Sequence, residues 1–357
     1  MRRKALMLPP LASLLLSFAA LADSAPPTQL SAVQVDDVIG RLNTGLNDYV
    51  FPDVARAVQR QLQAHRSEYR AIRDPVALAS RLTSDMRAVG HDRHLQVSYG
   101  EELGLKKDQS VEQKRAAHAY DLANGFGFRS ARRFPGNIGY IDIAYFSPDP
   151  DAGAQLAAAM QVVAGTDALI IDLRRNGGGS GEMAATVLSY FFDEPVELSS
   201  IVERRAGHDT VRQKWTSPYV AGPRYLAKPI YILVSVHTHS AAEFCAYDLK
   251  NLHRATLVGE RTSGDANSST GEIDLGDGFA ALIPNGRTLS PLTNTNWEGV
   301  GVQPDVVASP GEELTAAYVM ALKAVGTASG DLRKERDAAL ANPQSALLEE
   351  LDGFITK

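Results

Sequence analysis

The sequence of 357 residues contains a single cysteine, Cys245, so it cannot form an intramolecular disulfide. The neighbours Phe244 and Ala246 favour a buried helical position over the exposed, activated sulfur of a thiol nucleophile. The formal net charge is −6 and no basic cluster occurs beyond the N-terminus, so we expect no nucleic-acid partner. No later segment is long and apolar enough to cross a membrane.

The N-terminus has the pattern of a cleavable secretory signal. Three basic residues at 2–4 precede a short apolar run at 11–21, and Ala-Leu-Ala at 20–22 offers small residues to a signal peptidase. An uncleaved anchor is the alternative, although the run is short for a full span. We expect residues 1–22 to be removed and the mature protein to be periplasmic or secreted, without stable membrane insertion.

Residues 29–90 have the apolar spacing of helices. Asp74 and Pro75 are typical of a helix start, and Gly90 of a helix end. This predicts a small N-terminal helical domain over 23–96.

Strand and helix signals alternate farther along the chain. One alternating segment and three apolar runs predict strands at 138–143, 168–173, 229–235 and 255–259, and the intervening patterns predict helices at 153–164, 181–192 and 240–252. Such an order predicts an α/β core with largely parallel strands. We assign it to 137–312, followed by a helical tail at 313–357.

The first candidate loop, 172–179, follows a predicted buried strand and ends in three consecutive glycines. Glycines let the backbone turn tightly and direct N–H groups at an anion or an oxyanion. The Lys-Ser/Thr ending of a phosphate-binding loop is absent. A simple turn is the alternative to a functional loop.

The second candidate loop places Ser240 between a predicted strand and an Ala-rich helix. At a helix N-terminus, the N–H of Ala241 could stabilise a developing negative charge. The alternative is that Ser240 only caps the helix, with Glu243 completing a capping box. His237 and His239 have no acidic or cysteine partner at ligand spacing, so we predict no metal site and no cofactor.

With two later motifs, these loops resemble the tail-specific (C-terminal processing) protease family, peptidase family S41, over roughly 125–310. The matching segments, in the order of the family, are 172–179, 240–243, Gly-Glu-x-Thr-x-Gly at 259–264 and Trp-Glu-Gly-x-Gly-Val-x-Pro-Asp at 297–305. The last motif and the helical segment are similar to the tricorn and interphotoreceptor retinoid-binding branch. The resemblance implies a crotonase-like core, preceded by a helical domain, that hydrolyses peptide bonds of a peptide or protein substrate.

The resemblance also implies a role for individual residues. They are Ser240 as nucleophile, His94 as general base, Glu298 as the residue that orients the base, and the amides of Ala241 and of Gly177 or Gly178 as oxyanion donors. His91 is the second choice for the base. A serine precedes the histidine in the tricorn branch, whereas Arg93 stands here.

Other departures from the family limit the mechanism. Asp265 occupies the position of the lysine in the Ser–Lys branch, so a Ser–Lys dyad is not expected. Residues 97–136 are too few for a PDZ domain, and we expect only a connecting segment. A non-catalytic carrier of apolar ligands and an esterase using the same serine are the alternatives. The sequence leaves open whether the protein forms a homo-oligomer.

Overall fold

A computed structural model describes residues 29–100, 110–268, 271–326 and 330–352. The predicted signal sequence at 1–22 lies outside these residues. None of the helices in these ranges combines the length and the apolar character needed to cross a membrane.

The N-terminal region is helical, as predicted. Its helices are α1 (Ala32–Gly45), α2 (Pro52–Ala64), α3 (Arg66–Ala71) and α4 (Pro75–Gly90), with a short 3₁₀ turn, η1, at Leu46–Asp48. The Asp74 side chain accepts a hydrogen bond from Ala77 N at 2.8 Å and so caps the start of α4. His91, in the left-handed conformation with φ of 52°, ends α4 directly after Gly90.

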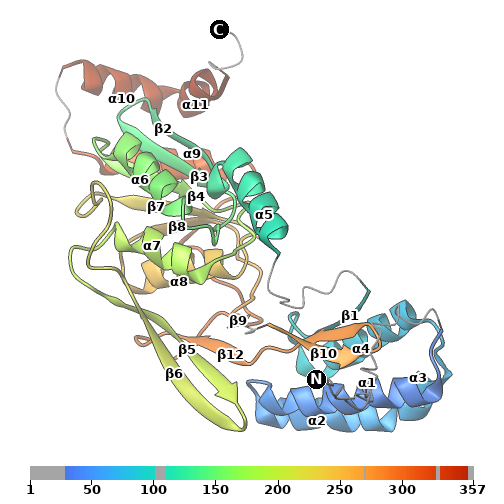
Figure 1. Cartoon of the computed structure of the whole chain (residues 1–357). Helices are drawn as coiled ribbons and strands as arrows, with labels where there is room; N and C mark the ends of the chain where they lie inside the picture. The colour runs from blue at the N-terminus through green and yellow to red at the C-terminus, as the bar shows by residue number, and fades with distance from the viewer. Residues whose placement is uncertain (1–28, 101–109, 269–270, 327–329, 353–357) are drawn as a thin grey trace, which may run out of the picture.

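A small antiparallel sheet joins these helices to a distant part of the chain. It consists of β1 (Gln96–Tyr99), β11 (Phe279–Leu282) and β10 (Glu272–Gly276), in the order β1-β11-β10. Leu275, Phe279 and Ile283 belong to the apolar cluster formed by the helices. The chain thus returns from the predicted core to complete the N-terminal region, at the lower right of Figure 1.

The central sheet has six strands in the order β13-β8-β7-β4-β3-β2. Their bounds are β2 (Phe128–Phe134), β3 (Ile138–Ile143), β4 (Ala168–Asp172), β7 (Ile230–Val234), β8 (Thr256–Gly259) and β13 (Val306–Val307). All neighbours pair in parallel except β2 and β3, which are antiparallel. The four predicted strands and their largely parallel pairing are confirmed.

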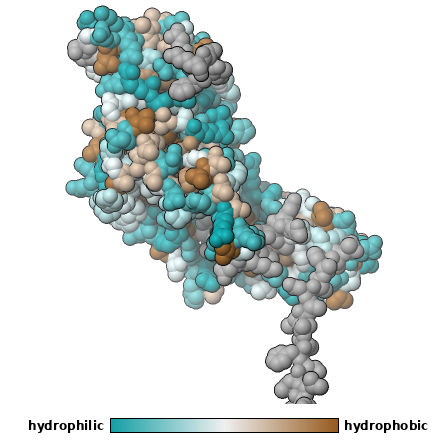
Figure 2. Space-filling view, turned by 45° about the horizontal axis from the view of Figure 1, so that its top comes forward, coloured by the Kyte–Doolittle hydropathy of each residue, from teal (hydrophilic) through white to brown (hydrophobic). Residues whose placement is uncertain are grey.

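Helices cover both faces of this sheet, as expected for parallel strands. One face packs on α6 (Ala152–Val163), α7 (Gly181–Ser189) and α8 (Ala241–Asn251). The other face packs on the C-terminal helices α9 (Glu313–Ala324), α10 (Asp331–Ala341) and α11 (Pro343–Asp352). Large apolar side chains therefore lie inside, and the face in Figure 2 shows only small, separate groups of apolar residues.

Residues between the helical region and the core contain α5 (Val111–Ala123) and a 3₁₀ turn, η2 (Gly125–Gly127). A further antiparallel sheet, which we did not predict, has the order β6-β5-β12-β9. Its strands are β5 (Glu197–Arg205), β6 (His208–Trp215), β9 (Asn267–Ser268) and β12 (Gly286–Leu289). The β5–β6 hairpin reaches down beside the N-terminal helices in Figure 1, where Ala206 N donates to Asp48 Oδ1 at 2.8 Å.

A buried carboxylate fixes the start of α8 against the loop that follows β8. Glu243 is fully buried, and no salt bridge to it occurs in the described part of the chain. Its oxygens accept five hydrogen bonds, from Ser240 N (3.0 Å), Thr262 Oγ1 (2.5 Å), Ser263 Oγ (3.1 Å), Gly264 N (2.7 Å) and Asp265 N (2.9 Å). The predicted capping role of Glu243 is thus one part of a larger set of contacts that joins two loops.

We predict that Glu243→Gln lowers the free energy of unfolding by about 3 kcal/mol, because an amide NH₂ would face N–H and O–H donors that lose their acceptor. Urea denaturation of the two proteins measures the difference. Glu260→Gln is the matched control, since its carboxylate has no hydrogen-bond partner among the described residues. Equal losses in the two variants would contradict the prediction.

Candidate active site

Ser240 lies at the N-terminus of α8, directly after the loop that leaves β7. Its backbone has φ of 50° and ψ of −114°, which is an uncommon and strained conformation for a residue with a side chain. The loop is held by Thr238 Oγ1, which donates to Leu173 O at 2.8 Å, and by His239 N, which donates to Asn176 O at 3.0 Å. The predicted position of the serine at a helix start is confirmed.

The glycine loop packs directly against this serine. A Cβ atom on Gly178, whose φ is +95°, would lie 3.0 Å from Ser240 Cβ and 3.0 Å from His239 O. Only glycine avoids both the strain and the contact. Gly178 N already donates to Asn176 Oδ1 at 2.9 Å, whereas the N–H groups of Gly177 and Ala241 have no hydrogen-bond partner among the described residues.

Ser240 opens onto a cavity of about 200 Å³. The cavity wall is formed by the glycine loop, the start of α8, the 265–268 segment, the β5–β6 hairpin and Trp297. Cys245, five residues after Ser240 on α8, is fully buried, and burial raises the pKa of its thiol. The serine, and not the cysteine, is therefore the nucleophile candidate on this helix.

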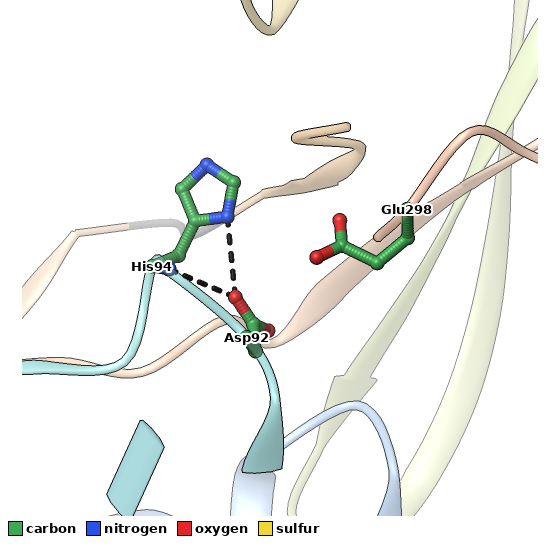
Figure 3. A group of neighbouring side chains, drawn as sticks. All are labelled: Asp92, His94 and Glu298. Atoms are coloured by element: carbon green, nitrogen blue, oxygen red, sulfur yellow. Dashed lines mark hydrogen bonds and ion pairs between the residues drawn. The ribbon is translucent and has the colours of Figure 1, made fainter. Parts of the chain in front are cut away.

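His94 lies in the loop between α4 and β1, beside a buried aspartate. Asp92 is 2% exposed, and its Oδ1 accepts a hydrogen bond from His94 N at 2.8 Å. The imidazole Nδ1 lies 3.3 Å from the same oxygen, at ion-pair distance but not aligned as a hydrogen bond. The second ring nitrogen, Nε2, points away from Asp92 (Figure 3).

The far side of Asp92 is also fixed. Its Oδ2 accepts hydrogen bonds from Tyr49 Oη at 3.0 Å and from Asn267 Nδ2 at 3.0 Å. Burial raises the pKa of Asp92, but contacts with His94 and Asn267 outweigh it, so the net pKa lies below its ordinary value. Asp92 is therefore held as a carboxylate next to the imidazole.

The pKa of His94 lies above its ordinary value of 6.5. Burial lowers it, but the contact with Asp92 and the negative charges of Glu298 and Asp265 act more strongly in the opposite direction. The imidazolium is thus stabilised by three carboxylates from three separate parts of the chain.

Glu298 approaches the same group from the motif at 297–305 (Figure 3). Its Oε2 accepts hydrogen bonds from Ala266 N at 2.7 Å and Asn267 N at 2.8 Å. Burial and the charge of Asp92 raise the pKa of Glu298, although these two amides lower it. No hydrogen bond joins Glu298 to His94 in the described part of the chain.

The donor atoms of Asp92, His94 and Glu298 all lie within 4.8 Å of one another, a spacing that could also hold a cation. Asp92 Oδ2 and Glu298 Oε2 already accept two hydrogen bonds each. One oxygen of each carboxylate is thus committed to protein donors, and the other Asp92 oxygen lies beside the imidazole, an arrangement that fits an imidazole held by carboxylates.

The predicted site residues lie in two groups in the structure. Ser240, Ala241 and the glycine loop form one, and His94 with Glu298 forms the other. No hydrogen bond joins Ser240 to a histidine among the described residues. The 265–267 segment connects the groups, because Asp265 lines the Ser240 cavity while Asn267 contacts Asp92. His91, the second choice for the base, is exposed at the end of α4.

Two acidic partners were not found from the sequence. Asp92, two residues before His94, could have been recognised from that short spacing. Asp265 Oδ2 lies 2.7 Å from His239 Nδ1, so His239 has an acidic partner in the structure although none occurs at ligand spacing in the sequence. The partner comes from a loop 26 residues away, beyond the reach of local spacing.

Comparisons with known proteins match both the helical region and the core. The model of peptidase family S41 matches residues 137–308, and the model of the N-terminal domain of family S41 in eukaryotic interphotoreceptor retinoid-binding protein matches 32–123. The chloroplast C-terminal processing peptidase of Tetradesmus obliquus is 30% identical over 175 residues, which are 48% of this chain and 35% of that protein. The tricorn protease of Thermoplasma volcanium is 28% identical over 179 residues, which are 49% of this chain and 15% of that protein.

A lipoprotein from Streptococcus agalactiae has the same fold, with a TM-score of 0.57 and 16% identity over 86% of this chain and all of that chain. For the peptidase of Tetradesmus obliquus and the tricorn protease of Thermoplasma volcanium, in contrast, the chain spans well under half of the length of each relative. The two family models cover the helical region and the core in the order that the family has, and the chain belongs to peptidase family S41.

Proposed function

We propose that the protein is an exported serine peptidase with Ser240 as its nucleophile. One observation carries the proposal: a strained serine at a helix start, packed against a glycine loop, faces a cavity beside an amide that has no partner in the described part of the chain. Backbone strain at a nucleophile exposes its side chain to substrate, and a free N–H at a helix N-terminus stabilises an oxyanion.

The reaction follows the acyl-enzyme scheme. Ser240 Oγ attacks the scissile carbonyl carbon while its proton passes to Nε2 of neutral His94. The oxyanion is bound by the amides of Ala241 and Gly177, the latter favoured over Gly178 because the Gly178 N–H already donates to Asn176. His94 then protonates the leaving amine as the C–N bond breaks. Water next attacks the acyl ester and gives a proton to His94, and the C–Oγ bond breaks as His94 returns the proton to Ser240 Oγ and the acid product leaves. The mechanism requires Nε2 to reach Oγ in the substrate complex, directly or through one bridging group.

Carboxylates hold the base in this proposal. Asp92 contacts the imidazole and stabilises the cation that forms during the reaction. Glu298 Oε2 accepts hydrogen bonds from two backbone amides, and its carboxylate adds a second negative charge near the imidazole. In this proposal Glu298 therefore performs part of the orienting role predicted for it. Asp92 takes over the direct contact with the imidazole.

Other features support the finer assignments. The parallel sheet covered by helices on both faces fits a crotonase-like core, and the basic, apolar and small-residue order at 1–22 fits export to the periplasm or beyond the cell. The substrate is a peptide or protein. A carrier of apolar ligands is disfavoured, because Lys214, Arg212, Glu182 and Asp265 all line the cavity.

The first test is covalent labelling. A fluorophosphonate probe should label the mature protein. Ser240→Ala should not be labelled, and its kcat on peptides should be lower by at least about 10³-fold. Ser309→Ala, a change of an exposed serine, is the control and should label normally. Persistent labelling of Ser240→Ala would place the nucleophile elsewhere.

The second test concerns the base. We expect His94→Asn to lower kcat by about 10³-fold or more, because the serine loses its proton acceptor, while substrate binding changes little. His91→Asn is the matched control, since asparagine tolerates the left-handed backbone at that position. A large loss in His91→Asn with normal turnover in His94→Asn would transfer the role to His91.

The third test uses pH. The base must be neutral, so kcat/KM rises as pH passes through the raised pKa of His94. Asp92→Asn removes a negative charge that raises this pKa, so the acidic limb of the profile should move to lower pH while kcat falls by about 10²-fold. A loss of kcat with an unmoved limb would mean that Asp92 acts only through folding.

A further inference from the structure

The cavity beside Ser240 contains a buried lysine that the proposed reaction does not use. Lys214 lies on β6, where it is the only buried residue, and its side chain is 8% exposed. Both Lys214 and Ser240 line the cavity. Burying an ammonium costs free energy unless an opposite charge and hydrogen-bond acceptors compensate for the lost water. Lys214, in the cavity beside Ser240, therefore requires such partners.

The partners of this lysine within the protein are few. Nζ lies 2.8 Å from Glu182 Oε1 and 5.7 Å from the ring centroid of Phe244. An ammonium has three donors, and this is the single hydrogen bond it makes among the described residues. Glu182 is 73% exposed and also contacts Arg212 at 3.4 Å, so its charge is shared and largely solvated.

The remaining acidic groups near the cavity are occupied. Asp265 accepts hydrogen bonds from Ser263 Oγ and pairs with His239. Asp248 is buried and directs both oxygens to Ser199, accepting from its N at 2.8 Å and its Oγ at 2.5 Å. Burial raises the pKa of Asp248 and the charge of Lys214 lowers it, but no hydrogen bond joins Asp248 to Lys214 among the described residues. Lys214 therefore keeps two donors without a partner among the described residues, while the Oδ1 of Asn267 is a neutral acceptor in the same cavity that also has none.

The ammonium of Lys214 lies close to the two segments that carry Ser240 and the glycine loop. Phe244, whose ring Nζ approaches, lies one helical turn after Ser240 on α8 and lines the same cavity. A Cβ atom on Gly181 would lie 3.2 Å from Nζ, which places the ammonium at the start of α7, just after the glycine loop. A substrate held by Ser240 and the glycine loop would direct an adjacent group toward Lys214.

We propose that Lys214, assisted by Arg212, binds a substrate carboxylate in this cavity and so makes the peptidase selective for peptides with a carboxylate next to the scissile bond. This carboxylate belongs either to an acidic side chain of the substrate or to the substrate C-terminus. This inference rests on the proposed peptidase function and names the substrate class of that site.

The test compares peptides that differ only in the carboxylate. A position-scanned series replaces Glu by Gln at each residue near the cleaved bond, with amidated C-termini, and a second series pairs free with amidated C-termini. We expect one of the two series to show a preference of about tenfold or more in kcat/KM for the carboxylate. The series that responds identifies the source. Equal cleavage within every pair would overturn the proposal.

The variants link the preference to the lysine. Lys214→Gln should reduce the ratio between paired peptides to near one, and Lys214→Arg should retain it because the charge remains. Arg212→Gln, a change at an exposed strand position, should reduce the ratio in part and serves if Lys214→Gln does not fold. An unchanged ratio in a folded Lys214→Gln, or in Arg212→Gln where only that variant folds, would overturn the assignment.

A binding measurement separates this inference from the proposed function. Fluorescent versions of the same peptides are titrated against Ser240→Ala, which needs no turnover, and the carboxylate form should bind about tenfold more tightly. Selective binding without hydrolysis by the wild-type protein would leave the carboxylate site standing and remove the peptidase. Hydrolysis without selectivity in either assay would support the peptidase and overturn the carboxylate site.

Discussion

The candidate active site depends on the burial of one carboxylate, Glu243, among five hydrogen-bond donors. A charge in the interior without a cation is tolerated only if its oxygens are fully bonded. These bonds fix the backbone of Ser240 at one end and the loop through Asp265 at the other. The strained conformation at Ser240 persists because the surrounding contacts define it from several sides.

The proposed nucleophile and base belong to different parts of the molecule. Ser240 starts a helix of the core, whereas His94 follows the last helix of the N-terminal region. The 265–267 segment bridges them by lining the cavity and contacting Asp92, and the strands β10 and β11 return to pack in the N-terminal cluster. Positioning the base thus requires the two regions to fold against one another.

Charge is arranged differently around His94 and along the wall of the Ser240 cavity. Asp92, Glu298 and Asp265 surround the imidazole and favour its protonated form, which suits a base that becomes cationic during the reaction. Lys214 and Arg212 lie on the hairpin side, where a substrate would extend. In the proposed function, the hairpin would add recognition to a core that supplies the chemistry, in keeping with the general location of binding residues on connecting segments.

The sequence by itself determined the elements whose signals are local. One alternating segment and three apolar runs predicted four of the six strands of the central sheet, and β2 and β13 were not predicted. Asp74 with Pro75 indicated the start of α4, and the order of the motifs indicated the family. Tertiary structure alone decided which distant groups meet: Asp265 with His239, Asn267 with Asp92, Lys214 with the Ser240 cavity, and the return of β10 and β11 to the helical region. The physical reason is that a pairing between loops is set by the packing of the whole chain and leaves no periodic pattern in either segment.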